Sequence, residues 1–273
     1  MTKDFGAGFH VAPSQNVDVL AYEQWTGRWS RLFVPSVFAA VRIAPDGRVL
    51  DVSTGTGEAA RLALPLAGEA GLVVGADISP TMLHGARRRL QAPRFLPVGA
   101  DGQALPFRDA SFDNVVCHLG LQFFPKPEHG VAEFRRVLRP GGRAAVCVIS
   151  TPDRAPMWGI LADAVASLRP DLRSILHLSF ALHDPVRLEG LFAGAGLNDV
   201  RVERETRDDI VESFEEYWKP AEAGVGSIPQ SYLALSDAHR RLVRQEVRSK
   251  FARFDAKGKL HLSVEMLIAV GQA

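Results

Sequence analysis

Short apolar runs alternate with helical stretches through the middle of the chain. The runs have the length and composition of β-strands, and they lie at residues 49–52, 72–76, 95–98, 115–117 and 144–149. Between the second and third runs, Ser79 has the position of a helix N-cap and Pro80 that of the first helical residue. Strands and helices that alternate in this order form a parallel α/β sheet. Residues 48–150 are therefore expected to form an α/β core.

The segment before this core is predicted to be helical. Its apolar residues follow the spacing of one helix face, at positions 34, 37, 38 and 41. The same segment is rich in aromatic residues, among them Tyr22, Trp25 and Trp29. We expect residues 1–47 to form a helical lid, although an ordinary apolar helix face explains the aromatic residues equally well.

The segments after the core predict further helices and two more strands. Residues 151–230 are mostly helical in pattern with a strand near 200–202, and Ser213 with Glu216 has the spacing of a capping box. Residues 231–273 contain a helix and a final apolar strand at 264–270, which is expected at an edge or in a hairpin. The pattern predicts a mostly parallel, seven-stranded sheet with an antiparallel last strand and a helical cap inserted between strands five and six.

Composition narrows the class of protein. The hydrophobic fraction of 47% is sufficient for a large core, and a formal net charge of +1 gives no field that would hold a nucleic acid backbone. Cys117 and Cys147 lie in apolar runs without the spacing of metal ligands, so no metal is expected. The sequence has no signal-peptide pattern and no run of about 18 apolar residues. These features predict a cytoplasmic protein with no membrane or nucleic acid partner.

A small-residue loop follows the first strand and is the first candidate ligand site. Gly55 and Gly57 have no Cβ, so a ligand can approach the backbone closely. The loop lies at the carboxyl end of a strand, where open α/β sheets bind their ligands. Taken alone, it could also be an ordinary tight turn between a strand and a helix.

Acidic residues follow the second and third strands. Asp77 comes 20 residues after Gly57, which is the spacing at which an acid reaches a nucleotide ribose. Asp101 could accept a hydrogen bond from the exocyclic amine of adenine. The simpler alternatives are a helix cap for Asp77 and a loop residue for Asp101. Because the carboxyl ends of parallel strands meet at one edge, these acids and the loop are expected to form one site.

Five motifs follow one another over residues 48–149. They are VLDVSTGTG, VVGADISPTML, GADGQALPF, SFDNVV and FRRVLRPGGR. In this order and spacing the sequence resembles the class I methyltransferases that use S-adenosylmethionine (SAM), in particular the group of the ubiquinone and menaquinone biosynthesis methyltransferases. The resemblance implies a Rossmann-like fold, SAM as the cofactor and methyl transfer to a small molecule.

The resemblance also implies a role for each motif residue. The loop from Ser53 to Gly57 would lie beside the methionine part of SAM, and Asp77 would bind the ribose hydroxyls. Adenine would pack on Ile78 and Met82, and residues 101–103 would contact its edge. The family usually has glycine where this chain has Ser53. The residues expected at the cofactor are Asp51, Ser53, Thr54, Gly55, Gly57, Asp77, Ile78, Met82, Asp101, Gly102, Gln103 and His118.

His118 ends the fourth strand, near the expected position of the methyl group, and is the candidate general base. The alternative, which we favour, is a histidine that packs on the cofactor or lines the pocket. His177 and His183 in the inserted segment are further candidates, although each could be a surface or capping residue. The residues expected to contact the acceptor or cover the site are Tyr22, Trp25, Trp29, Gln122 and Trp218.

Two other functions are compatible with the sequence. An NAD(P)-dependent oxidoreductase also has a strand, a glycine loop and a ribose acid, but here Ala60 occupies the third glycine position. A SAM-binding protein without catalysis would share every motif. The apolar residues outside 48–149 favour a small, apolar or aromatic acceptor over a macromolecule. The acceptor atom and the oligomeric state stay open.

Overall fold

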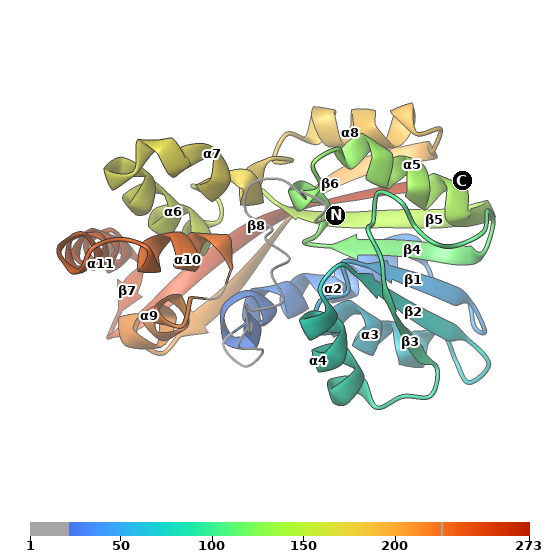
Figure 1. Cartoon of the computed structure of the whole chain (residues 1–273), viewed down its shortest axis with the longest axis horizontal. Helices are drawn as coiled ribbons and strands as arrows, with labels where there is room; N and C mark the ends of the chain where they lie inside the picture. The colour runs from blue at the N-terminus through green and yellow to red at the C-terminus, as the bar shows by residue number, and fades with distance from the viewer. Residues whose placement is uncertain (1–21, 225) are drawn as a thin grey trace.

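One mixed β-sheet runs through the molecule, and its two longest strands extend almost from end to end (Figure 1). The computed structural model describes residues 22–224 and 226–273. The strand order is β3-β2-β1-β4-β5-β8-β6, and the short β7 pairs with β8. The strands are β1 Arg48–Val52, β2 Leu72–Asp77, β3 Phe95–Gly99, β4 Phe112–His118, β5 Leu138–Ile149, β6 Asn198–Val211, β7 Asp255–Ala256 and β8 Lys259–Gln272.

The strand directions confirm the predicted α/β class. β1 to β5 pair with one another in parallel, and each contains one of the five apolar runs of the sequence. β8 is antiparallel to both β5 and β6. The edge position expected for the last strand is wrong, since β8 lies inside the sheet and forms a hairpin only with the two-residue β7. Met266 and Ile268 are buried in the cluster on one face, and Leu267 and Ala269 in the cluster on the other face. β8 is therefore covered on both faces here, which explains the continuous apolar run at 266–269.

Helices cover both faces of the parallel part of the sheet. On one face, α2, α3 and α4 share a buried cluster with strand residues such as Val49 and Val116. On the other face, α5 and α8 share a second cluster with Leu50 and Val115, the residues of opposite orientation. These elements are η1 Glu23–Gly27, α2 Arg28–Val41, α3 Glu58–Leu66, α4 Pro80–Leu90, η2 Leu121–Phe123, α5 Pro127–Val137 and α8 Pro185–Gly194.

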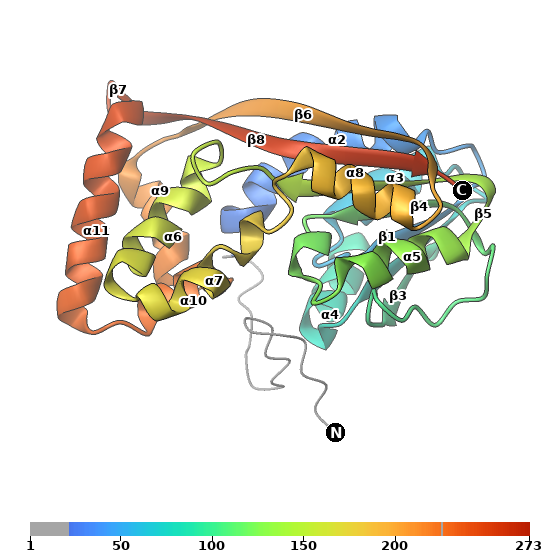
Figure 2. The same ribbon diagram turned by 90° about the horizontal axis from the view of Figure 1, so that it is seen from above.

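The remaining helices form a separate helical lobe. β6 and β8 pair with each other along their whole length, whereas β5 pairs with β8 only from Ile149 to Arg143. Beyond β5 the two strands continue as a ribbon into the lobe (Figure 2). Among the described helices, none is long and apolar enough to cross a membrane. The lobe elements are α6 Pro156–Leu168, η3 Pro170–Leu172, α7 Arg173–Leu176, η4 Leu178–Phe180, α9 Phe214–Glu222, α10 Ser227–Leu233, α11 Asp237–Phe251 and η5 Ala252–Phe254.

The helical insertion is divided around β6. α6 and α7 lie between the fifth and sixth strands as predicted, but α9, α10 and α11 follow β6. The helix expected from Ser213 and the helix expected within residues 231–273 both follow the strand near 200–202, as the sequence pattern predicts. Ser213 does begin α9, because its hydroxyl accepts a hydrogen bond from the Glu216 backbone N–H at 3.1 Å. Since β5 ends at Ile149 and α6 begins at Pro156, the lobe faces the carboxyl edge of the parallel strands.

Candidate cofactor and acceptor site

The glycine loop connects β1 to α3 at the carboxyl edge of the sheet. Ser53, Gly55 and Gly57 have positive φ angles of 59°, 54° and 83°. A Cβ at Gly57 would lie 2.9 Å from the Leu90 side chain, so α4 packs closely on the loop only because position 57 is glycine. Ser53 holds a conformation that favours glycine. Its side chain is accommodated because the facing residue, Gly120, has no Cβ that would overlap it.

Asp51 is a buried acid directly below this loop. Its Oδ2 accepts hydrogen bonds from the Thr54 hydroxyl at 2.6 Å and from the Ala60 backbone N–H at 3.0 Å. Its Oδ1 is buried and has no hydrogen-bond partner among the residues that the structure describes. Burial raises the pKa of Asp51 to about 7, against the lowering effect of the two hydrogen bonds. Asp51 therefore presents an unpaired oxygen that a cationic ligand would stabilise.

Asp77 ends β2 and fastens the loop. Its Oδ2 accepts a hydrogen bond from the Gly55 backbone N–H, and its Oδ1 accepts one from the Ser79 backbone N–H, both at 2.8 Å. Burial raises the pKa of Asp77, while the backbone hydrogen bonds lower it. A carboxylate has about four acceptor positions. Asp77 can thus hold the loop and still accept hydrogen bonds from two ribose hydroxyls.

The residues expected around adenine follow β2 and β3. Ile78 and Met82 are half-buried at the start of α4, at the same edge of the sheet. Asp101 Oδ1 accepts hydrogen bonds from the Gln103 backbone N–H at 2.9 Å and from its side-chain amide at 3.2 Å. A Cβ at Gly102 would overlap the Phe124 ring. Gly102 is therefore required for packing as well as being available to a ligand.

His118 is buried at the end of β4. Its Nε2 lies 3.0 Å from the backbone oxygen of Ser30 in α2, which requires the tautomer with the proton on Nε2. Its Nδ1 is then an acceptor, and it has no partner within the described part of the chain. Burial lowers the pKa of His118 to about 4, so the imidazole is neutral at pH 7.

The N-terminal helix closes over the glycine loop. Tyr22, Glu23 and residues of α2 line a small cavity of about 20 Å³ together with Asp51, the loop and His118. The Glu23 carboxylate bonds to the Thr56 hydroxyl, and it pairs with Arg89 at 3.1 Å and Arg31 at 3.2 Å. Burial and the charge of Asp77 raise the pKa of the Tyr22 hydroxyl. The structure thus brings Tyr22 to the cofactor site and adds Glu23, which has no distinguishing pattern in the sequence.

The three tryptophans expected in the lid pack elsewhere. Trp29 is buried in the core, and the Trp25 ring lies 5.3 Å from the Tyr217 ring. Trp218 is fully buried inside the helical lobe, where it stacks on Phe214 and its Nε1 donates a hydrogen bond to Glu222 at 2.9 Å. None of the three tryptophans lines either of the two cavities described here. Their large apolar areas hold the lobe and the N-terminal helix in place.

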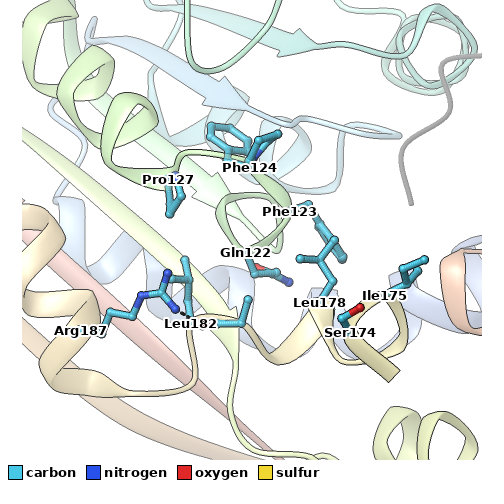
Figure 3. Close-up of a pocket in the computed structure, with 11 residues that line it drawn as sticks. Gln122, Phe123, Phe124, Pro127, Ser174, Ile175, Leu178, Leu182 and Arg187 are labelled. Carbon is cyan, nitrogen blue, oxygen red and sulfur yellow. Dashed lines mark hydrogen bonds between the residues drawn. The ribbon is translucent and has the colours of Figure 1, made fainter. Parts of the chain in front are cut away.

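A larger cavity of about 300 Å³ lies where the segment after β4 meets the inserted helices (Figure 3). Gln122 lies in the middle of it and is 2% exposed, and neither of its amide atoms has a described partner. His177 and His183 do not line this cavity. The His177 Nε2 lies 3.0 Å from Asp163, and the His183 Nδ1 lies 2.7 Å from the Phe180 backbone oxygen. The lining residues are Gln122, Phe123, Phe124, Pro125, Pro127, Ser174, Ile175, Leu178, Ala181, Leu182 and Arg187.

Unpaired buried polar atoms are concentrated at this edge. Within residues 22–224 and 226–273, five buried side-chain atoms lack a hydrogen-bond partner, and four of them belong to Asp51, His118 and Gln122. Such atoms are rare in native proteins and indicate binding sites when they gather in one place. The Asp51 oxygen suits the ammonium group of SAM, so the residues present fit this cofactor. No cluster of potential metal ligands occurs within the same described residues.

Comparisons with known proteins agree with this geometry. A sequence profile described as a methyltransferase domain matches residues 50–146. The chain is 42% identical over 163 residues to demethylmenaquinone methyltransferase of Renibacterium salmoninarum, covering 59% of this chain and 64% of the relative. The corresponding Thermus thermophilus protein is 35% identical over 186 residues, covering 63% of this chain and 81% of the relative. The chain thus spans just under two thirds of the Renibacterium protein.

Solved structures share the fold. YcgJ protein from Bacillus subtilis has a TM-score of 0.56 at 19% identity, covering 90% of this chain and 98% of that one. Phosphoethanolamine N-methyltransferase 2 of Haemonchus contortus, solved with S-adenosylhomocysteine, has a TM-score of 0.57 at 17% identity, covering 94% and 57%. The fold also occurs in the [4+2]-cyclase SpnF, with a TM-score of 0.53 at 20% identity, covering 91% and 82%.

The glycine loop, with Asp51 and Asp77 at the ends of β1 and β2, and the similarity to the curated relatives define a class I SAM-dependent methyltransferase, with SAM as its cofactor. Within that class, the chain belongs to the family of the demethylmenaquinone and ubiquinone/menaquinone biosynthesis methyltransferases. The oxidoreductase alternative is thereby excluded. The occurrence of the same fold in a cyclase means that the fold alone does not fix the reaction.

Proposed function

We propose that this protein transfers the methyl group of SAM to a small, largely apolar acceptor with a quinone-type aromatic ring. The observation that carries the proposal is the group of unpaired buried polar atoms on Asp51, His118 and Gln122, at the sheet edge that faces the lobe. The names of the relatives support the quinone-type ring, because they act on demethylmenaquinone.

Asp51 and Asp77 would hold the two ends of the cofactor. Asp51 Oδ1 is available for the ammonium group, and the Asp77 carboxylate is available for the ribose hydroxyls. SAM supplies a methyl group that its sulfonium already activates. The contribution of the chain is therefore to orient the acceptor in line with that methyl group and to exclude water, and positioning of this kind can supply much of the rate.

His118 is better suited to positioning than to proton removal. A phenol has a pKa of about 10, whereas burial lowers the pKa of His118 to about 4. Direct proton transfer between them would be unfavourable by about 8 kcal/mol. We therefore propose that the His118 Nδ1 accepts a hydrogen bond from the acceptor or the cofactor. This corresponds to the alternative role, a histidine that lines the pocket.

Cofactor binding is tested by calorimetry with SAM and S-adenosylhomocysteine. We expect micromolar dissociation constants, equivalent to about −8 kcal/mol. Asp77→Ala should weaken binding by roughly 1–3 kcal/mol, because it removes hydrogen bonds to a charged acceptor. Asp237→Ala is the matched control, since Asp237 is an exposed acid on α11. Tight binding of NAD(P) without binding of SAM would refute the proposal.

Catalysis is tested by turnover with methyl-labelled SAM and a panel of hydroxylated aromatic rings, RNA and protein. We expect label in the small aromatic compounds only. Cofactor binding without label transfer to any acceptor would support the SAM-binding protein without catalysis. Labelling of RNA or protein, with the small aromatic compounds untouched, would contradict the proposed acceptor class.

A further inference from the structure

We infer that the cavity of about 300 Å³ between η2 and the segment α7–α8 binds the methyl-accepting substrate. We also infer that Gln122 recognises two neighbouring atoms of this substrate, one a hydrogen-bond donor and the other a hydrogen-bond acceptor. This inference rests on the proposed function, because it specifies the acceptor of the same site. It concerns a different cavity from the one that the glycine loop lines.

The chain places Gln122 between the two halves of the site. β4 ends at His118, which lines the cofactor cavity together with Leu119. Gln122 follows three residues after Leu119, in η2, and it lines the larger cavity. The other wall of that cavity comes from residues 174–187 of the first helical insertion. An acceptor bound there would lie between the cofactor edge of the sheet and the lobe.

The Gln122 side chain sets the polar part of the specificity. An amide presents N–H donors and a carbonyl acceptor in one plane. Both groups of Gln122 are buried without a described partner, and in Figure 3 the side chain lies among the apolar side chains that line the cavity. A ligand with a donor and an acceptor on neighbouring atoms would satisfy both groups at once. Lactams, carboxamides and neighbouring hydroxyl and carbonyl groups have this arrangement.

The side chains that line the cavity set the apolar part of the ligand specificity. Leu178 and Leu182 lie near Gln122, and Phe124 and Pro127 lie on the side of α5 (Figure 3). A volume of about 300 Å³ is at the lower end for ligand pockets, so it favours a ring system of one or two rings. Arg187 lines the same cavity and is exposed, and its guanidinium charge disfavours a cationic ligand. The structure thus favours a neutral or anionic ring compound with one donor–acceptor edge.

The probe for this cavity is 2-quinolone, a neutral two-ring lactam whose N–H and C=O are adjacent. N-methyl-2-quinolone lacks the donor, and naphthalene lacks the whole polar edge. In a fluorescence titration of the full chain, 2-quinolone should bind at least tenfold more tightly than either control compound. Gln122→Leu should reduce the affinity for 2-quinolone roughly 10- to 100-fold, since two buried hydrogen bonds are lost. Its unfolding temperature should not fall, because Gln122 makes no described hydrogen bond within the protein.

A second variant tests the cavity itself. Leu178→Trp should fill it and abolish binding of 2-quinolone, whereas Leu242→Trp, on the exposed surface of α11, should leave binding unchanged. Binding of S-adenosylhomocysteine, measured by calorimetry, should be the same in all three variants. The inference is overturned if the wild-type chain does not bind 2-quinolone, or if Gln122→Leu or Leu178→Trp binds it as tightly as wild type. Failure of the wild-type chain to bind S-adenosylhomocysteine would instead refute the proposed function.

Discussion

Asp51 shows how one side chain can link cofactor binding to pH. In the unliganded protein its pKa is raised to about 7 by burial. A cationic ammonium beside Oδ1 would favour the ionised form and lower this pKa on binding. Below pH 7, binding must therefore release a proton from Asp51, and above pH 7 it need not. Affinity is thus expected to rise with pH up to about 7 and to level off above it.

This prediction is checked by calorimetry with S-adenosylhomocysteine between about pH 5.5 and 8.5, where the rise should approach tenfold per pH unit on the acidic side. Asp51→Asn should weaken binding and remove this part of the pH dependence. At pH 8 it should also raise the unfolding temperature of the unliganded protein, because wild type then carries a buried, half-paired carboxylate. A pH profile that is unchanged in Asp51→Asn would show that another group titrates.

Ser53 and Gly120 form a compensating pair at the end of β1. Ser53 holds a φ of 59°, and the absence of a Cβ at Gly120 leaves room for its side chain. We predict that Ser53→Gly keeps or improves cofactor affinity, because glycine adopts this conformation without strain. Gly120→Ala alone should destabilise the protein by about 1–3 kcal/mol through overpacking.

The double variant tests the pairing of Ser53 and Gly120. Combining Ser53→Gly with Gly120→Ala should recover part of the stability lost in Gly120→Ala, because the Ser53 Cβ and Oγ that the new methyl group meets are gone. Chemical denaturation of the four proteins gives the coupling free energy. A loss of cofactor binding in Ser53→Gly would mean that the Ser53 hydroxyl makes a contact special to this protein.

At the level of single residues, the sequence located Asp51, Asp77 and the glycine loop correctly at one edge of the sheet. It did so because these residues lie at or directly after the ends of strands, and strand ends are predictable. The wall at 174–187 and the role of Glu23 were not predictable. Both depend on which helices contact one another in the folded chain. A single serine or glutamate on a helix has no hydrophobic periodicity that would reveal such a contact.

At the level of elements, we predict that η1 gates the part of the cofactor site beside the glycine loop. The cavity between η1 and the loop holds about 20 Å³, roughly the space for one water molecule, so we expect η1 to shift when SAM binds. Glu23 holds η1 closed through Thr56 and Arg89. We predict that Glu23→Gln raises the association and dissociation rates of S-adenosylhomocysteine several-fold. Its unfolding free energy should change by about 1 kcal/mol or less, because partly exposed ion pairs contribute little.

Stopped-flow fluorescence measures both rates. Glu215→Gln is the matched control, since Glu215 pairs with Arg244 and Arg248 of α11 and lines neither cavity. Unchanged rates in Glu23→Gln would mean that η1 moves without breaking this contact. A drop in affinity caused by the dissociation rate alone would instead assign Glu23 to cofactor binding.

Elements differ in how far the sequence predicts them. The strands β1 to β5 are buried and apolar, so their runs are visible in the sequence. β6 extends over 14 residues, but only 200–202 has an apolar pattern. As the last strand of the sheet it is largely exposed, and its charged residues resemble a loop. The sequence pattern therefore places a strand near 200–202 but does not reveal that it extends to Val211.

At the level of the whole molecule, the ribbon of β6 and β8 joins the core to the lobe (Figure 2). Arg28 of α2 adds a second connection, because it pairs with Glu216 at 2.6 Å and donates a hydrogen bond to the Ile210 oxygen at 2.6 Å. Trp25 also packs against Tyr217 of the lobe. The lobe is therefore held at a defined position opposite the carboxyl edge of the sheet.

Substitution of Trp218 tests whether the lobe positions the methyl acceptor without contributing to cofactor binding. Trp218 is fully buried between Phe214 and Tyr232, and it lines neither cavity. Trp218→Ala should cost about 3–5 kcal/mol of stability, because the space left by the indole cannot be refilled. The loss falls on the lobe, which positions the acceptor wall at 174–187, whereas the cofactor loop is built from β1, β2 and α3. Acceptor turnover should therefore fall at least tenfold, with the dissociation constant of S-adenosylhomocysteine changed less than about threefold. Trp218→Phe, which keeps an aromatic ring in the cluster, should retain most of the turnover. Circular dichroism at the assay temperature establishes that each variant is folded. Equal losses of turnover and cofactor affinity in Trp218→Ala would contradict the prediction that the lobe acts on the acceptor and not on the cofactor.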